Sequence, residues 1–233
     1  MVTKTLTRAM ACLALLTLVC GTLLAQDSLN RRPSMASTRN AAASSIHNPA
    51  EKVPANCKPI YTNFGPSGDL YDANNGYFVS GIDNSFNAQK QDIALPFTPK
   101  VNSTVIQVKL PLQYYGYGFN GATVSIYSDA SGLPGSPLSG ATKNPMNFQD
   151  FGSGCCDLAV AWFPNGVKLT GGTQYWIVGT TNTKSEDSVN TWDFNFNDAA
   201  ATFAFQQDDG GWILITQSEG VAGPAGAVWG TTP

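Results

Sequence analysis

The residues that most often carry catalysis are scarce in this chain of 233 residues. It contains a single histidine, His47. Nucleophilic triads and Cys–His pairs need a positioned imidazole, and catalytic zinc is usually held by two or three histidines. The sequence also lacks a GxxxxGKS or GxxxxGKT loop and a strand-coupled GxGxxG, so nucleotide chemistry has no support. We therefore expect a protein without catalytic activity.

Paired carboxylates provide the enzymatic alternative. Asp193 and Asp198 flank the sequence FNFN, and a further acid, Asp208, lies nearby in the chain. A glycoside hydrolase needs two carboxyl groups about 5–9 Å apart on either side of a sugar. Alternation with Trp192 predicts that Asp193 faces solvent, whereas residues 208–211, DDGG, are typical of a hairpin turn. The alternative function is therefore a domain that cleaves glycosides or esters with these acids.

Oxygen ligands for a hard cation occur together in GPSGDLYDANNGY. Asp69, Asp72 and Asn74 stand at the short spacing that suits Ca²⁺. The segment does not match an EF-hand loop, and clusters of Asp, Asn and Gly are equally typical of turns. Ca²⁺ is the one cofactor for which the sequence offers candidates, and otherwise we expect none.

Aromatic rings are concentrated in the sequence QYYGYGFN, residues 113–120. Tyr114, Tyr115, Tyr117 and Phe119 lie within six positions, and the glycines between them prevent all four rings from facing one core. Exposed aromatic side chains stack on sugar rings and anchor protein interfaces. We expect these four residues to bind a ligand, either a glycan or a cell-surface protein.

Three cysteines follow the N-terminal region, and they cannot all pair within one chain. Cys155 and Cys156 are neighbours, and Cys57 stands about a hundred positions earlier. A bridge between Cys57 and either neighbour would close a long loop, worth about 4 kcal/mol in the chain-entropy model. A metal site is the third option, without supporting CxxC spacing. We favour the pair of neighbours, because Cys57 borders a polar tail.

The N-terminus resembles a secretory signal. Lys4 and Arg8 precede an apolar stretch that ends near Ala25, which is too short to span a bilayer. We expect residues 1–25 to be a signal peptide, with a lipoprotein signal at Cys20 as the alternative. The mature protein is then expected to be secreted, extracytoplasmic and free of the membrane.

Composition sets the class of the remaining chain. Charged residues make up 12% of it, about half of the roughly 25% of an average soluble domain. A net charge of −3 gives no electrostatic footprint for nucleic acid. Residues 26–56 are rich in Ala, Ser and Asn and contain no aromatic ring, so we expect a disordered spacer there.

Residues 57–233 alternate between short apolar runs and turn signals. Apolar residues recur at every second position in 106–112, 158–162 and 192–196, which indicates half-buried strands. No stretch has a sustained helical period. These features predict an all-β fold, an antiparallel two-sheet β-sandwich of jelly-roll type. We expect the space between the sheets to be filled by three tryptophans, Trp162, Trp176 and Trp192.

Several segments resemble exported bacterial β-sandwich modules of the kind found with PEP-CTERM or "choice-of-anchor" sorting tails. They are VSIYSDASGLPG at 124–135, LTGGTQYWIV at 169–178, the Cys155-Cys156 pair, and Phe203-Ala-Phe205 before Gly211-Trp212. The resemblance covers about 60–229 and implies a non-catalytic extracellular module, although no sorting tail follows. Residues and resemblance together predict an exported binding or structural module.

Overall fold

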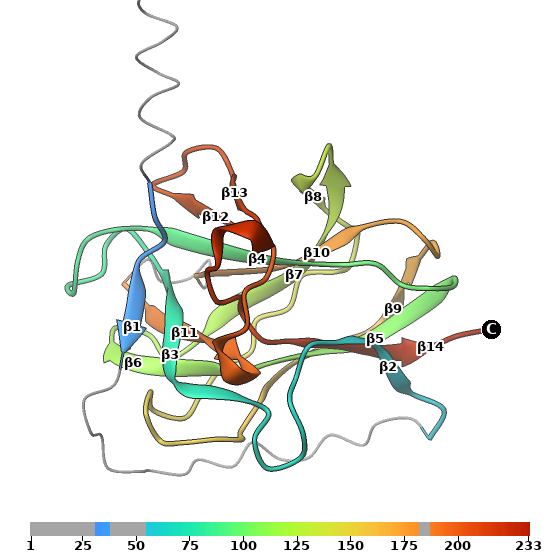
Figure 1. Cartoon of the computed structure of the whole chain (residues 1–233), viewed down its shortest axis with the longest axis horizontal. Coiled ribbons are helices and arrows are strands. Elements are labelled where there is room, and N and C mark those ends of the chain that lie inside the picture. The colour runs from blue at the N-terminus through green and yellow to red at the C-terminus, as the bar shows by residue number, and fades with distance from the viewer. Residues whose placement is uncertain (1–30, 38–54, 182–186) are drawn as a thin grey trace, which may run out of the picture. The chain divides into compact units, whose positions relative to one another are not determined.

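The computed structural model describes residues 31–37, 55–181 and 187–233 (Figure 1). Within these residues the chain forms two antiparallel β-sheets and two short 3₁₀ turns, η1 (Phe196–Asp198) and η2 (Gln217–Glu219). The predicted all-β, two-sheet sandwich is therefore confirmed. None of the described segments is a helix long and apolar enough to cross a bilayer. The expected signal peptide and His47 lie outside the described residues.

The larger sheet has ten strands, in the order β6-β11-β3-β4-β10-β7-β8. β1 pairs with β3, and the β12–β13 hairpin pairs with β4. The bounds are β1 Met35–Ser37, β3 Tyr71–Ser80, β4 Gln91–Phe97, β6 Leu112–Tyr117, β7 Ala122–Ala130, β8 Leu133–Pro137, β10 Tyr175–Thr181, β11 Val189–Asn195, β12 Phe203–Gln207 and β13 Ile213–Ile215.

The smaller sheet has four strands, in the order β2-β14-β5-β9. The bounds are β2 Lys58–Thr62, β5 Ser103–Leu110, β9 Ala159–Leu169 and β14 Ala227–Thr231. The chain passes from this sheet to the larger one at Pro111, between β5 and β6. Proline has no N–H to donate to a ladder, so it suits the point where one strand ends and the next begins.

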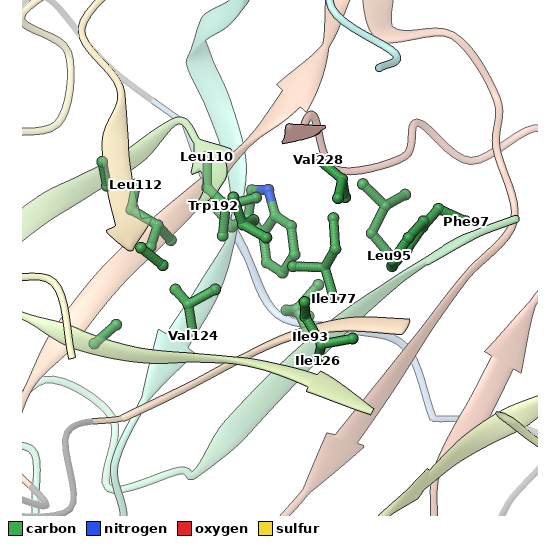
Figure 2. Close-up of a cluster of buried hydrophobic side chains, with 14 of the residues drawn as sticks. Ile93, Leu95, Phe97, Leu110, Leu112, Val124, Ile126, Ile177, Trp192 and Val228 are labelled. Carbon is green, nitrogen blue, oxygen red and sulfur yellow. The ribbon is translucent and has the colours of Figure 1, made fainter. Parts of the chain in front are cut away.

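The main core lies between the two sheets and contains Trp192 (Figure 2). Trp192 is fully buried, and its Nε1–H donates a 2.6 Å hydrogen bond to the carbonyl of Ala225. Figure 2 shows Trp192 in one cluster with Ile93 and Ile177 of the larger sheet and Val228 of the smaller sheet. This confirms the prediction that Trp192 fills the space between the sheets.

The other two tryptophans do not occupy that space. Trp176 is fully buried, but it belongs to a separate cluster with Ala94 and Val178, and its Nε1–H donates to Asp129 at 2.8 Å. In β9 the core residues are Ala159, Ala161 and Phe163, so the predicted face with Trp162 is wrong by one position. A strand shows only alternate residues to the core, so one error of parity moves a whole face.

The predicted hairpin turn at residues 208–211 is present, and a second tight turn lies between β7 and β8. β7 and β8 are antiparallel partners joined at Ser131-Gly132, and both of these residues have positive φ, 58° and 85°. β12 and β13 pair through Phe203 and Ile215 on either side of the 208–211 turn. Turn chemistry was therefore a reliable signal in this sequence, because few residues tolerate positive φ.

One strand lies inside the segment that the sequence predicts as a spacer. β1 pairs with residues 75–77 of β3, and it belongs to the compact unit Pro33–Pro233. Ser34, which precedes β1, is held by Gln91: the Ser34 N–H donates to Gln91 Oε1 at 2.7 Å, and Gln91 Nε2 donates back to the Ser34 carbonyl at 2.9 Å. The predicted boundary at residue 57 did not include this strand.

The cysteines pair as the sequence analysis favours. Cys155 and Cys156 form a disulfide across a cis peptide bond. Cys57 is a half-buried free thiol, and burial is the main cause that raises its pKa.

Candidate functional site

Three aromatic side chains gather at the surface beside the first residue of β11. Phe86 comes from the loop between β3 and β4, and Tyr115 and Tyr117 come from β6. The Phe86 ring centroid lies 5.1 Å from that of Tyr115 and 5.2 Å from that of Tyr117. The two tyrosine rings stack at 6.2 Å with planes 25° apart. We call Phe86, Tyr115 and Tyr117 the aromatic patch.

The aromatic patch is exposed on top and supported from below. Phe86 and Tyr117 keep 39% and 38% of their surface exposed. Tyr115 is half-buried because it contacts Phe78 edge-on at 4.9 Å and Phe151 at 5.6 Å. Phe78 and Phe151 are themselves buried against neighbouring strands. The rings are therefore held in place before any ligand arrives, which lowers the entropy cost of binding.

A buried amide fixes the loop that carries Phe86. Asn84 is 2% exposed, and its Oδ1 accepts hydrogen bonds from the backbone N–H groups of Phe86 and Asn87 at 3.1 and 2.9 Å. Its Nδ2 donates to the carbonyl of Gly81. Residues of a loop have no neighbouring strand to accept their backbone hydrogen bonds. The Asn84 side chain accepts them instead. Phe86 thereby reaches the tyrosines of β6 although it is far from them in sequence.

Gly116 allows the tyrosines on β6 to leave the regular ladder. Val189 is opposite Tyr117, but the next residue of β11 is opposite Tyr114, so the register shifts across two extra residues of β6. Gly116 lies within this bulge at φ +90°, a conformation that disfavours other residues. The bulge turns this end of β6 outward and leaves Tyr117 at the surface.

The two remaining predicted ligand residues lie elsewhere. Tyr114 packs against the main core, and its hydroxyl donates to the Gly118 carbonyl at 2.6 Å. Phe119 is half-buried, its N–H donates to Asp187 at 3.3 Å, and its ring touches Gly121, where an added Cβ would come within 2.7 Å. The structure thus brings together two of the four predicted residues and separates them from the other two.

The predicted cation ligands share a small cleft. Asp69, Asp72 and Asn74 line it together with Asp198, and its volume is about 290 Å³. Asp72 is already engaged, because its two carboxylate oxygens accept hydrogen bonds from Asn74 at 2.9 Å and Asn75 at 2.6 Å. Within the described residues, no three His, Cys, Asp or Glu side chains converge as metal ligands do. Ca²⁺ binding stays a prediction from ligand type.

Two of the cleft carboxyl groups interact directly. Burial is the main cause that raises the pKa of Asp198, and the charge of Asp72 and a hydrogen bond with its side chain raise it further. A neighbouring carboxylate disfavours the charged form of a carboxyl group. The predicted pairing of Asp198 with Asp193 or Asp208 is not formed in this cleft.

Asp193 is fully buried, so the prediction that it faces solvent is wrong. β11 lies between β6 and β3, and the chain after β8 covers its outer face. There the Tyr71 hydroxyl donates to the Asp157 carbonyl at 2.8 Å, and the Tyr114 N–H donates to the Gln149 carbonyl at 2.8 Å. Neither carboxyl oxygen of Asp193 accepts an ordinary hydrogen bond from a described residue. Burial raises the pKa of Asp193 well above its ordinary value of 3.8.

Asp208 lies in the β12–β13 turn, away from the cleft. Its carboxylate accepts a 3.1 Å hydrogen bond from the Lys90 N–H, and the Lys90 ammonium forms a 2.6 Å ion pair with Asp209. Both acids have positive φ, at 50° and 56°. These contacts give the two aspartates a role in shaping the turn.

Phe86 is not among the residues that the sequence analysis predicts, although its exposed fraction is as large as that of Tyr117. Phe86 lies in the loop sequence GIDNSFNAQK, where it is the single aromatic residue among mostly polar ones. An aromatic residue without a partner in its own segment is the signal that could have identified it. Its position beside β6 depends on the pairing of β11 with both β3 and β6, which is long-range information.

Compared with models of known protein families and with curated protein sequences, the chain matches none.

Proposed function

We propose that this domain is a non-catalytic binding module of the cell exterior, which presents the aromatic patch to a glycan. The observation that carries the proposal is the stacked pair Tyr115 and Tyr117 beside the exposed Phe86. Tyrosine rings stack on the apolar faces of sugar rings, and this contribution adds to simple area burial. The aromatic patch is preformed, so its affinity is not reduced by loop ordering.

The tyrosine hydroxyls add polar contacts to this surface. Within the described part of the chain, the hydroxyls of Tyr115 and Tyr117 accept and donate no hydrogen bond, which leaves them for water or a ligand. A sugar carries hydroxyl groups at the edge of its ring, within reach of such phenols when the ring faces stack. A glycan therefore stacks on the ring faces of the aromatic patch and hydrogen-bonds to the hydroxyl groups at the ring edges.

The first experiment is a glycan array probed with the mature protein and with the triple variant Phe86→Ala, Tyr115→Ala, Tyr117→Ala. We expect the triple variant to lose about tenfold or more in affinity, because it removes all three stacking surfaces. Leu214→Ala is the matched control, since Leu214 is 37% exposed and lies on the β12–β13 hairpin. Array binding that survives the triple variant would contradict the proposal.

One observation favours a protein partner as the second candidate. Phe86 has no polar atom in its side chain, yet it is more than a third exposed. Aromatic rings without polar edges are enriched at protein interfaces. Pull-downs from the native cell exterior, with the triple variant as the negative control, test this candidate. If every protein recovered with the unaltered domain is also recovered with the triple variant, this candidate is excluded.

A further inference from the structure

A second cavity opens at the other end of β11, between the two sheets. It has a volume of about 460 Å³, within the roughly 300–1,000 Å³ range of small-molecule sites. Tyr61 of β2 lines it from the smaller sheet, Leu95 of β4 from the larger one, and Asn195 from the end of β11. Figure 2 shows Leu95 beside Phe97, at the opposite end of the core cluster from Leu112.

Aromatic rings form part of the wall of this cavity. Tyr61, Phe64 and Phe196 all line it and are all half-buried. The Phe196 ring rests on Gly65, where an added Cβ would come within 2.5 Å of Phe196 Cγ and 2.4 Å of the Asp69 carbonyl oxygen. Gly65 therefore makes room for the ring. The cavity offers flat apolar surfaces that are fixed by the backbone beneath them.

Two polar groups in the lining have no partner in the described part of the chain. Asn195 is 5% exposed; its Nδ2 donates to the Ala199 carbonyl at 2.8 Å, while its Oδ1 accepts no hydrogen bond. Because Nδ2 is the end of the amide that can donate to the Ala199 carbonyl, this hydrogen bond determines the orientation of the Asn195 side chain. None of the described residues hydrogen-bonds to the Tyr61 hydroxyl either, and the Tyr61 ring centroid lies 5.8 Å from that of Phe97. A buried acceptor without a donor costs free energy that a ligand hydroxyl would recover.

The remaining polar groups are neutral. Thr202 and Gln217 line the cavity, and the Thr202 hydroxyl accepts a hydrogen bond from the Gln217 N–H at 3.3 Å. Among the described residues, those that line the cavity include no Asp, Glu, Lys, Arg or His. An ionic ligand would therefore lose its hydration without gaining a counter-charge. Burial also raises the pKa of Tyr61 to about 12, so its hydroxyl keeps its proton at neutral pH.

We propose that this cavity binds the ring of a single uncharged sugar unit. The apolar face of a pyranose packs on the Phe64 and Phe196 rings, and its hydroxyl groups meet the Tyr61 hydroxyl, the Asn195 Oδ1 and the Gln217 side chain. Rings combined with a few convergent neutral polar groups are the features that orient a small polar ligand. This inference is independent of the aromatic patch, which lies at the opposite end of β11.

The experiment measures binding of methyl glycosides of glucose, galactose, mannose and N-acetylglucosamine by heteronuclear NMR titration. We expect at least one glycoside to shift the signals of Thr202 and Gln217. Tyr61→Phe removes only the hydroxyl and keeps the contact with Phe97, so it should weaken that binding by about threefold to tenfold. Tyr127→Phe is the matched control, a half-buried tyrosine on β7 outside the cavity, and it should leave the affinity unchanged.

Each outcome has a definite meaning. If no glycoside shifts Thr202 or Gln217, or if Tyr61→Phe binds as the unaltered protein does, the inference is overturned. The wild-type shifts alone decide the matter if Tyr61→Phe folds poorly, as judged by its melting temperature. The triple variant of the aromatic patch should bind the same glycoside with unchanged affinity. If it does not, the sugar occupies the aromatic patch and only the proposed function survives.

Discussion

The two ends of β11 carry two aromatic surfaces that are built in different ways. At the Val189 end, the aromatic patch is exposed and its rings contact one another. At the Asn195 end, the rings are half-buried around a cavity, whose lining includes Asn195 Oδ1, a buried acceptor that no described residue hydrogen-bonds. Six residue steps of about 3.3 Å separate the two ends, so they are roughly 20 Å apart. An exposed platform suits a long ligand lying on the surface, whereas a cavity suits one ring.

The aromatic rings at the two ends of β11 also rest on different supports. The rings of the aromatic patch are supported by other aromatic rings, Phe78 and Phe151. In the cavity, the Phe196 ring lies directly on the backbone at Gly65, whereas the Tyr61 ring contacts Phe97. Trp192 lies midway between the two ends and is fully buried.

The largest effect is expected from Trp192→Ala. It empties the centre of the core and leaves the Ala225 carbonyl without its donor, so we expect a loss of about 3–5 kcal/mol in the free energy of unfolding. Denaturant unfolding followed by fluorescence measures it. The matched control is Trp162→Ala, at a half-buried position of β9, which should cost much less. Equal losses in the two variants would show that Trp192 does not hold β11 in place.

The next largest effect is expected on the pH dependence of stability, and it comes from the buried Asp193 carboxyl group beside Trp192. Its folded pKa lies above the value of an unfolded aspartate, so between the two values the unfolded chain releases a proton that the folded chain keeps. Stability should fall as the pH rises above about 4, with a slope of up to about 1.4 kcal/mol per pH unit. Asp193→Asn should remove this part of the slope. Unfolding curves at several pH values test it, and identical slopes in both proteins would contradict the burial of an uncharged carboxyl group.

Gly65→Ala distinguishes the two ends of β11. The added methyl group must displace the Phe196 ring or the Asp69 carbonyl, which we expect to cost about 1–3 kcal/mol of stability and to close part of the cavity. Glycoside binding should weaken, while glycan-array binding through the aromatic patch should stay the same. Gly211→Ala is the control, because a Cβ there meets no atom within 4 Å. Loss of both binding activities in Gly65→Ala would mean that the two ends are not independent.

The smallest effect is expected from reduction of the disulfide. Cys155 and Cys156 are adjacent, so their bond constrains little of the unfolded chain. Its contribution should be about 1 kcal/mol or less, compared with more than 4 kcal/mol for a bridge that closes a hundred-residue loop. Melting curves with and without a reductant measure the difference. A large drop on reduction would indicate that Cys57 takes part in a bridge in solution.

The sequence predicted the parts of the fold that depend on local signals. The turn at residues 208–211 follows from residues that accept positive φ, and it appears in the structure. The burial of Trp192 follows from its position in an alternating run. The parity of β9 was not predictable in this way, because Trp162 and Phe163 are both plausible core residues and only their packing partners decide between them.

The candidate site shows a similar division. Tyr115 and Tyr117 were recognised from composition, whereas Phe86 joins them through the pairing of distant strands. Alternation with Trp192 predicts that Asp193 faces solvent, and no local pattern in the sequence indicates that the chain after β8 folds over that face. The second cavity combines residues from β2, β4, β11 and η2, so no single segment of the sequence contains its pattern.

The short strand β1 has a consequence for how this sheet is completed. β4 pairs with β3 only at Ser80 and Gln91, so β3 would show free N–H and C=O groups along residues 75–77 if β1 were absent. β1 fills that gap from within the same chain, so its pairing with β3 is intramolecular and has an effective concentration of its own. A separate peptide with the sequence of β1 would have to reach that concentration to replace it. Conversely, a chain cut after Ser37 would offer this gap to the corresponding strand of another copy, which is the route to strand exchange between molecules.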